Sequence, residues 1–453
     1  MVLIVVTCLV GVSSNCLAEV TDSRAVRPNI IWIMADDLGY GDLGCYGQKE
    51  IRTPCIDRLA GEGMRFTQCY AGSTVCAPTR CVLMTGKHTG HCRVRGNSAR
   101  LPESRKSILV PLEPDDVTVA KLLKGAGYAT GICGKWGLGE RGTTGIPNIQ
   151  GFDQWLGFLN QRHAHGYYPE FIWENQDVRI LDGNRGGHQG EWVHDQLTEF
   201  ALRFIEESSA GGPFFLYVAY TIPHGRYEIP SDEPYSDRPW PQSVKNYAAM
   251  VTRMDRDVGR IVTQLESLGI ERDTVVFFTS DNGAEIYYFR RSNEVDQYAA
   301  ILNSSGCLRG YKRDLTDGGI RVPMIVRWPG RVTAGSVNDH VWAFWDFLPT
   351  AAELAGVDPP EDVDGISVVP TLLGKQQKTH EFLYGEFFER GFQQAVRYDK
   401  WKAIRLKQGQ PLVLYDVTKD LGEEHDVAAG HPDVIARIEN YLKTARTESK
   451  YWP

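Results

Sequence analysis

Four short apolar runs, each ending abruptly in polar or charged residues, constrain the fold more than any other feature of this chain. They occupy residues 29–34, 128–133, 214–220 and 274–279. Continuous apolar runs of this length are typical of strands buried on both faces, as in parallel sheets. Patterns typical of helices lie between them, at residues 116–126, 191–208 and 243–268. This alternation predicts an α/β fold with a mostly parallel sheet flanked by helices.

The polar residues that follow these runs are candidates for a site, because open α/β sheets bind ligands beyond the carboxyl ends of their strands. They are Asp36, Asp37, Lys135, His224, Asp281 and Asn282. The acidic and amide groups among them supply the hard oxygen ligands that Ca²⁺ and Mg²⁺ prefer. Taken alone, Asp-Asp-Leu-Gly and Asp-Asn-Gly are more typical of plain turns than of a metal site. Their position directly after separate strands favours a metal site.

The sequence pattern changes in the last part of the chain. A strand over 322–328 and an amphipathic helix over 341–355 complete the first unit. Shorter alternating segments follow, at residues 381–388, 393–398, 400–406 and 412–416, and then a helix near 432–446. Alternating segments of this kind are typical of an antiparallel sheet. We therefore expect a large α/β domain over 19–375 and a smaller C-terminal α+β subdomain over 376–453.

The N-terminal residues predict export. Residues 2–12 form an apolar run too short to span a bilayer, and Cys16-Leu17-Ala18 follows. We expect a signal peptide over residues 1–18, a periplasmic or secreted protein and no stable membrane insertion. Eight later cysteines could form disulfides, but their spacing assigns no pairs. The net charge of −8 argues against nonspecific nucleic-acid binding.

The run over residues 75–86, VCAPTRCVLMTG, is the strongest chemical signal. Pro78 is typical of the first turn of a helix, which places Cys76 where free backbone N–H groups favour an anion. Arg80, one turn further on, can reach the same anion. The alternative is a disulfide-bonded or buried structural cysteine. We expect instead that Cys76 faces a solvent-filled pocket.

The complete pattern C-x-P-[S/T]-R-x-x-x-x-T-G resembles the signature of the type I, formylglycine-dependent sulfatases, an arylsulfatase-like family of the alkaline phosphatase superfamily. The resemblance implies an alkaline-phosphatase-like fold. It also implies that a formylglycine-generating enzyme or an anaerobic maturase converts Cys76 to formylglycine, whose hydrate attacks sulfur. One divalent cation, Ca²⁺ in preference to Mg²⁺, would bind residue 76 and the D-D-x-G and D-N-G segments: Asp36, Asp37, Cys76, Asp281 and Asn282.

Three more residues match motifs of the same family. Lys135 lies in Gly-Lys-Trp-Gly-Leu-Gly, similar to the family's G-K-W-H-L-G, and His224 follows Pro223 as in its P-H motif. Lys312 matches G-x-K-x-x-x-x-E-G-G-x-R-V-P, with Asp317 in place of the Glu. The resemblance implies that these three residues hold sulfate and that His224 or Lys312 assists departure of the alcohol. Without it, Lys135 would be an ordinary surface charge; Arg313 is the alternative to Lys312.

One position departs from the family. Gly137 stands where the family has a His that contacts the formylglycine hydrate and helps to expel sulfate. The gap must then be filled by water, by substrate or by another side chain. His163 and His165 are the nearest candidates. We favour His165, because it follows the segment 155–158, which in sulfatases returns the chain toward the pocket.

Two loops are candidates for leaving-group recognition, residues 161–174 and 284–307. Both combine aromatic residues with charged ones, among them Glu285, Tyr288, Tyr168 and Trp173. Such surfaces suit a sugar ring, so we expect a sulfated carbohydrate substrate in preference to a small aryl or alkyl sulfate. A phosphomonoester or phosphonate hydrolase on the same scaffold is the first rival. A catalytically silent glycan-binding homologue, favoured only by Gly137, is the second.

Overall fold

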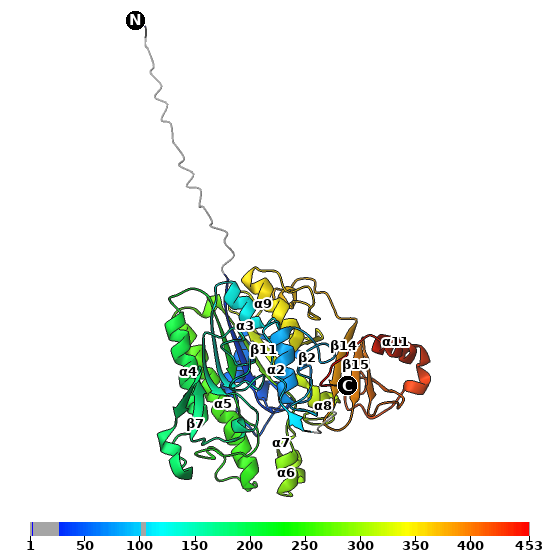
Figure 1. Cartoon of the computed structure of the whole chain (residues 1–453), viewed down its shortest axis with the longest axis horizontal. Helices are drawn as coiled ribbons and strands as arrows, with labels where there is room; N and C mark the ends of the chain where they lie inside the picture. The colour runs from blue at the N-terminus through cyan, green and yellow to red at the C-terminus, as the bar shows by residue number, and fades with distance from the viewer. Residues whose placement is uncertain (1, 3–26, 101–105, 453) are drawn as a thin grey trace.

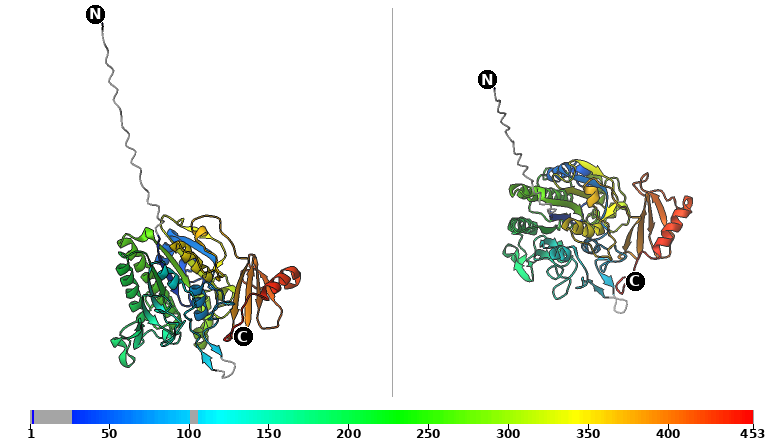
Figure 2. Two further views of the ribbon diagram at one scale, coloured as in Figure 1. Left: turned by 45° about the horizontal axis from the view of Figure 1, so that its top comes forward. Right: turned by 90° about the horizontal axis from the view of Figure 1, so that it is seen from above.

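The computed structural model of this chain describes residues 2, 27–100 and 106–452. The signal peptide predicted for residues 1–18 lies, except for Val2, outside the described residues. The described chain forms one large mixed sheet with helices on both faces and, beside it, a smaller sheet packed on a single helix (Figures 1 and 2).

The large sheet has eleven strands with a parallel centre. In spatial order they are β12 (Ser336–Asn338), β2 (Met64–Tyr70), β11 (Arg321–Arg327), β10 (Thr274–Ser280), β1 (Asn29–Ala35), β9 (Phe214–Ala219), β5 (Ala129–Lys135), β6 (Gln154–Phe158), β7 (Phe171–Glu174) and β8 (Asp177–Ile180), with β13 (Trp342–Ala343) beside β2. The five strands from β10 to β6 run parallel, whereas β11 and β7 pair antiparallel with their neighbours. The predicted mostly parallel, mixed sheet is confirmed.

The central strands are apolar throughout because both of their faces are buried. Along β1, Ile30, Trp32 and Met34 belong to one hydrophobic cluster. Their neighbours Ile31 and Ile33 belong to a second cluster on the opposite face. Successive side chains of a strand point to opposite faces, so two covered faces require an unbroken apolar run.

Two groups of helices cover the two faces (Figure 1). One face carries α2 (Cys76–Thr85), α3 (Val119–Gly125) and α9 (Phe347–Ala355), which contact one another. The other carries α1 (Pro54–Glu62), α4 (Val193–Ser208) and α5 (Gln242–Ser267). The shorter helices are α6 (Tyr287–Arg291), α7 (Val295–Leu302), α8 (Asp317–Ile320) and α10 (Val369–Leu372).

Some predicted helices have different bounds. The helix expected over 116–126 begins at Val119, because the Thr118 hydroxyl accepts a hydrogen bond from the Lys121 N–H and caps it. The prediction of a helix over 341–355 was wrong for the first part of that range, where β13 and a 3₁₀ turn (Phe344–Asp346) precede α9. There Asp346 accepts the N–H of Ala343, which holds the turn in place of a longer helix.

The C-terminal part is an antiparallel sheet with one helix, as predicted. Its strands are β14 (Phe382–Phe387), β15 (Gln393–Tyr398), β16 (Trp401–Arg405) and β17 (Val413–Asp416), and α11 (Pro432–Leu442) packs on them. The helix ends four residues earlier than expected. Figure 1 shows this unit at one side of the molecule, with α11 outermost.

A buried ion-pair cluster joins the two units. Lys402, on β16, lies 2.6 Å from Asp317 at the start of α8 and 3.0 Å from Glu423. The Asp317 carboxylate also forms an ion pair with the Arg321 guanidinium at 3.3 Å. Asp317, which stands where the family motif has Glu, therefore contacts the C-terminal sheet.

Two further observations concern the described residues as a whole. No helix in the described ranges combines the length and apolar character needed to cross a membrane. All eight cysteines from Cys45 to Cys307 are free thiols, so the structure pairs none of them.

Candidate active site

The carboxyl ends of β1 and β10 bring two acidic segments together. The strands run parallel with Ala35 opposite Ser280, so Asp36 and Asp281 emerge side by side. The Asp281 N–H donates to the Ala35 carbonyl at 3.1 Å, and the Asp37 N–H donates to the Asp281 carboxylate at 3.1 Å. Asp37 has a left-handed backbone, with φ of 70°, a conformation that Asp tolerates better than most residues.

Two more strands end at the same place. Lys135 is the last residue of β5, and the Asp36 N–H donates to the carbonyl of Ile222, which follows β9. Gly134 permits this close approach of strands, since a Cβ there would lie 1.8 Å from the Ala219 carbonyl oxygen. The strand ends thus converge on one site, which the spacing in the sequence alone does not show.

Cys76 is the first residue of α2, and its side chain lies at the centre of the cluster. Its sulfur is 3.2 Å from Lys135 Nζ, 3.5 Å from Lys312 Nζ and 3.4 Å from Asp36 Oδ1. Cys76 is only 2% exposed, so the expectation of a solvent-facing side chain was wrong. Burial, together with the charge of Asp36, raises the pKa of the Cys76 thiol to about 12.

The charges around Cys76 are paired. Lys135 lies 2.5 Å from Asp36, and Lys312 lies 2.6 Å from Asp37. Burial alone would raise the pKa of Asp36, but Lys135 and the other nearby cations hold it well below its ordinary value. Arg80 is fully buried and donates to Asp281 at 2.9 Å and to the Lys135 carbonyl at 2.6 Å. Arg80 therefore contacts an acidic side chain and the β5 backbone.

The donor set of this cluster fits a divalent cation. Four side chains each offer one possible ligand atom, and these atoms all lie within 4.8 Å of one another. The four residues are Asp36, Asp37, Cys76 and His224. The Asn282 amide N–H donates to Asp37 at 2.7 Å, while its own carbonyl oxygen is buried and has no hydrogen-bond partner among the residues that the structure describes. Such an oxygen is a ligand that a hard cation would bind.

Asp281 supports the same assignment. Burial, together with the charge of Asp36, raises the pKa of Asp281 to about 7, although Arg80 acts in the opposite direction. Two carboxylates held this close in a buried site repel each other, and a divalent cation between them would relieve that repulsion.

Two histidines lie together beside the cluster. His224 Nε2 is 3.4 Å from Asp37 Oδ2, and the His165 ring stacks on the His224 ring with centroids 4.2 Å apart. Burial and the neighbouring His224 lower the pKa of His165 to about 2, so the ring is neutral. His163 packs instead between Phe158 and Phe171. The structure therefore brings His165, and not His163, against His224.

The place beside Gly137 holds a residue that the sequence analysis missed. A Cβ at position 137 would lie 2.0 Å from Nε2 of Gln161. The Gln161 side chain thus occupies the space that any side chain at position 137 would enter. Gln161 lies in the predicted 161–174 loop but belongs to none of the family motifs quoted above, so no motif singled it out.

Two other predicted residues have their own partners. Arg313, at φ of 76°, pairs with Glu389 at 3.3 Å, whereas the adjacent Lys312 pairs with Asp37. Glu285 is buried and accepts the backbone N–H groups of Tyr287 and Tyr288, which begin α6. Burial and Asp37 raise the pKa of Glu285.

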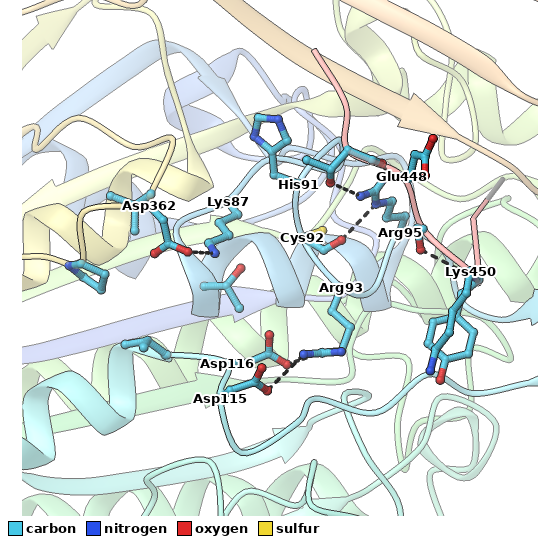
Figure 3. Close-up of a pocket in the computed structure, with 17 residues that line it drawn as sticks. Lys87, His91, Cys92, Arg93, Arg95, Asp115, Asp116, Asp362, Glu448 and Lys450 are labelled. Carbon is cyan, nitrogen blue, oxygen red and sulfur yellow. Dashed lines mark hydrogen bonds and ion pairs between the residues drawn. The ribbon is translucent and has the colours of Figure 1, made fainter. Parts of the chain in front are cut away.

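A separate cavity of about 420 Å³ lies beyond the other end of α2, between Lys87 and Lys450 (Figure 3). Two of the cations in its wall have acidic partners: Lys87 pairs with Asp362, and Arg93 pairs with Asp115 and Asp116. Because α2 runs from Cys76 to Thr85, roughly 15 Å of helix separates this cavity from the polar cluster.

Comparisons with known proteins agree with this geometry. The sequence profile of the Sulfatase family matches residues 28–357, and that of the N-sulphoglucosamine sulphohydrolase C-terminal region matches residues 310–448. Arylsulfatase A of Homo sapiens is 32% identical over 461 residues, which cover 91% of this chain and 86% of that protein. N-acetylgalactosamine-6-O-sulfatase of Bacteroides thetaiotaomicron is 30% identical over 503 residues, covering 93% of each chain.

A solved structure shows the same overall arrangement. The crystal structure of Ps i-CgsB in complex with k-i-k-neocarrahexaose matches with a TM-score of 0.81 at 28% identity, covering 94% of this chain and 95% of that one. The sequence match spans the strands, α2 and the polar cluster described above. This chain belongs to the sulfatase family and is a sulfuric ester hydrolase.

Proposed function

We propose that this sulfatase hydrolyses a sulfate monoester of a carbohydrate at the cluster around residue 76. Membership of the sulfatase family implies a divalent metal and a formylglycine made from cysteine. The convergence of Lys135 and Lys312 on the Cys76 sulfur is the observation that supports this site most strongly. Formylglycine at position 76, as its hydrate, supplies the hydroxyl nucleophile, which sulfate esters require.

The cations of the cluster have a direct role in this proposal. Lys135 and Lys312 bind the nonbridging oxygens of the sulfate group, where charge must be stabilised as the ester bond breaks. His224, next to Asp37, or Lys312 protonates the departing alcohol oxygen. Arg80 fixes Asp281 and the end of β5.

We assign the metal as Ca²⁺, held by Asp36, Asp37, Asp281 and Asn282 with residue 76. Four oxygen-bearing side chains suit a hard cation, and Ca²⁺ tolerates varied ligand geometry more readily than Mg²⁺ does. The buried, unpartnered Asn282 carbonyl oxygen supports its place in this set. A bound cation would supply Lewis-acid chemistry beside residue 76.

We further propose that a formylglycine-generating enzyme or an anaerobic maturase modifies Cys76 before the chain folds. At 2% exposure, Cys76 has no surface that another enzyme could reach in the folded protein. Export to the periplasm or the outside of the cell, with cleavage after Ala18, remains part of this proposal. The mature N-terminus, determined on protein from the native cell, tests the cleavage.

A sulfated carbohydrate suits the surroundings of the histidine pair. A cavity of about 470 Å³ is lined by the predicted 161–174 loop, with Arg162, His163, Tyr168 and Phe171 in its wall, and by Arg226, two residues after His224. Aromatic faces and guanidinium groups bind sugar rings and their hydroxyls or anions. Relatives of this chain include an N-acetylgalactosamine-6-O-sulfatase and a protein solved with neocarrahexaose.

The experiment is a panel of defined sulfated mono- and oligosaccharides and aryl sulfates, scored for released sulfate as kcat/KM. We expect at least one glycan to exceed every aryl sulfate. Equal or faster turnover of aryl sulfates would overturn the carbohydrate assignment. Matched phosphate esters in the same panel should react far more slowly.

A further inference from the structure

The carboxamide of Gln161 is an unpaired polar group at the edge of the active site. Gln161 lies in the turn between β6 and the 3₁₀ turn of His163–His165. Its Nε2 and Oε1 are both buried and have no hydrogen-bond partner among the described residues. Buried polar groups in native proteins are nearly all paired, because an unpaired one loses its hydration without compensation. A ligand that pairs this group is therefore expected.

Backbone contacts place Gln161 next to Lys135. The Trp136 N–H donates to the Phe158 carbonyl and the Gly137 N–H donates to the Leu159 carbonyl, each at 2.9 Å. Residues 135–137 and 158–161 therefore run side by side. The Gln161 amide lies over Gly137, two residues beyond Lys135, whose ammonium is 3.2 Å from the Cys76 sulfur.

The same turn reaches the cluster at its other end. His165 stacks on His224, and the turn is held by Asn160, whose side-chain carbonyl accepts the His163 N–H at 2.9 Å. Gln161 thus lies on a short, anchored segment between two parts of the site, the end of β5 and the histidine pair.

Gln161 differs chemically from the groups around it. Lys135, Lys312 and Arg80 are each paired with a carboxylate. The Gln161 amide is neutral and brings two N–H donors that no residue of the described chain accepts. A tetrahedral oxyanion bound beside Lys135 presents acceptor oxygens that match these donors.

We propose that Gln161 is a substrate-binding residue that donates a hydrogen bond from Nε2 to a sulfate oxygen. This inference rests on the proposed sulfate site and deepens it. An amide does not exchange a proton with substrate near neutral pH, so Gln161 orients the sulfate group and leaves proton transfer to other side chains. Gly137 is required by the same arrangement, because any larger residue there would displace the amide.

The test compares Gln161→Leu and Gln161→Glu with wild type, using inorganic sulfate as the probe. Sulfate affinity is measured by calorimetry and as a competitive inhibition constant. We expect Gln161→Leu to weaken sulfate binding and raise KM by about tenfold, the value of one hydrogen bond to a charged group, with kcat changed by less than about threefold. Gln161→Glu should weaken binding further, because its carboxylate repels the anion.

Thermal unfolding separates this role from a structural one. Gln161→Leu removes two unpaired buried atoms, so its Tm should equal or exceed that of wild type. The control is Gln150→Leu, since Gln150 is a buried glutamine whose amide donates to the carbonyls of Glu113 and Thr144. The control should lower Tm and leave sulfate affinity unchanged.

Three outcomes are distinguishable. Wild-type sulfate affinity and KM in Gln161→Leu would overturn this inference and leave the sulfate site intact. A lower Tm with unchanged sulfate affinity would assign Gln161 a structural role and would also overturn it. If wild-type protein neither binds sulfate nor releases it from any ester, the proposed function itself fails.

Discussion

The Lys135 ammonium lies 3.2 Å from the Cys76 sulfur, with both residues fully enclosed. Burial alone would lower the pKa of Lys135, but Asp36 and Cys76 raise it above its ordinary value, so the side chain is charged. A fixed buried cation beside the nucleophile position binds an anion more strongly than an exposed one, since water does not screen it.

Lys135→Ala should therefore lower kcat/KM by about 10²–10³-fold, the usual cost of losing one preorganised charge-stabilising group. The control is Lys124→Ala, which removes an exposed lysine paired with Asp153. Steady-state kinetics on the best substrate, with Tm measured in parallel, checks the prediction. A loss of less than about threefold in Lys135→Ala would contradict the role given to this residue.

The two histidine variants should differ. His165→Ala removes the ring stacked on His224 and should lower kcat and kcat/KM together, whereas His163→Ala removes a ring packed between two phenylalanines and should matter less to turnover. The kcat and kcat/KM of the two variants, compared with wild type, check this prediction. Near-normal rates in both would leave the reaction to Lys135, His224, Lys312 and the metal.

Removal of the metal should abolish most activity. Chelation leaves Asp36 and Asp281 in mutual repulsion and Asn282 Oδ1 unpaired, so added Ca²⁺ should restore turnover better than Zn²⁺ does. Activity is assayed after dialysis against chelator and stepwise addition of each ion. Restoration by zinc alone would overturn the assignment to hard oxygen ligands.

The Asp317 cluster predicts a stability effect with a defined pH dependence. Burial alone would raise the pKa of Asp317, but Lys402 and Arg321 hold it well below its ordinary value. Because the folded-state pKa is lowered, this stabilisation is fully present above the unfolded pKa of about 4 and is lost progressively as the pH falls from there through the lower folded-state pKa.

Asp317→Asn leaves Lys402 buried with Glu423 as its remaining acidic partner among the described residues. It should destabilise the protein by about 3 kcal/mol at pH 7, a typical cost of breaking a buried ion pair. The difference from wild type should shrink toward pH 3. Urea unfolding at pH 7 and pH 3 measures the free energy of unfolding of the variant and of wild type. An equal difference between the two proteins at both pH values would contradict the ion-pair explanation.

The sequence predicted those features that depend on local pattern. The strands of the sheet centre were found because two covered faces demand continuous apolar runs, as Ile30 to Met34 show. Asp36, Lys135 and Asp281 were found because they follow such strands. The 341–355 segment was misread because a single side chain, Asp346, caps a turn that periodicity does not reveal.

Other features depend on contacts between distant residues and leave no local signal. The choice between His163 and His165 is set by the turn that Asn160 anchors, and the place beside Gly137 is filled by a glutamine from the neighbouring strand end. Arg313 pairs with Glu389 and Lys312 pairs with Asp37, partners that the adjacent positions of the two residues in the sequence do not reveal.

The state of residue 76 tests the central claim most directly. The measurement is peptide mass spectrometry of the 75–86 segment from protein produced with a formylglycine-generating enzyme, set beside the sulfatase activity of the same sample. We predict that residue 76 has lost its sulfur in the active fraction and that Cys76→Ala is folded but inactive. Full activity from protein in which Cys76 is unmodified would contradict the account.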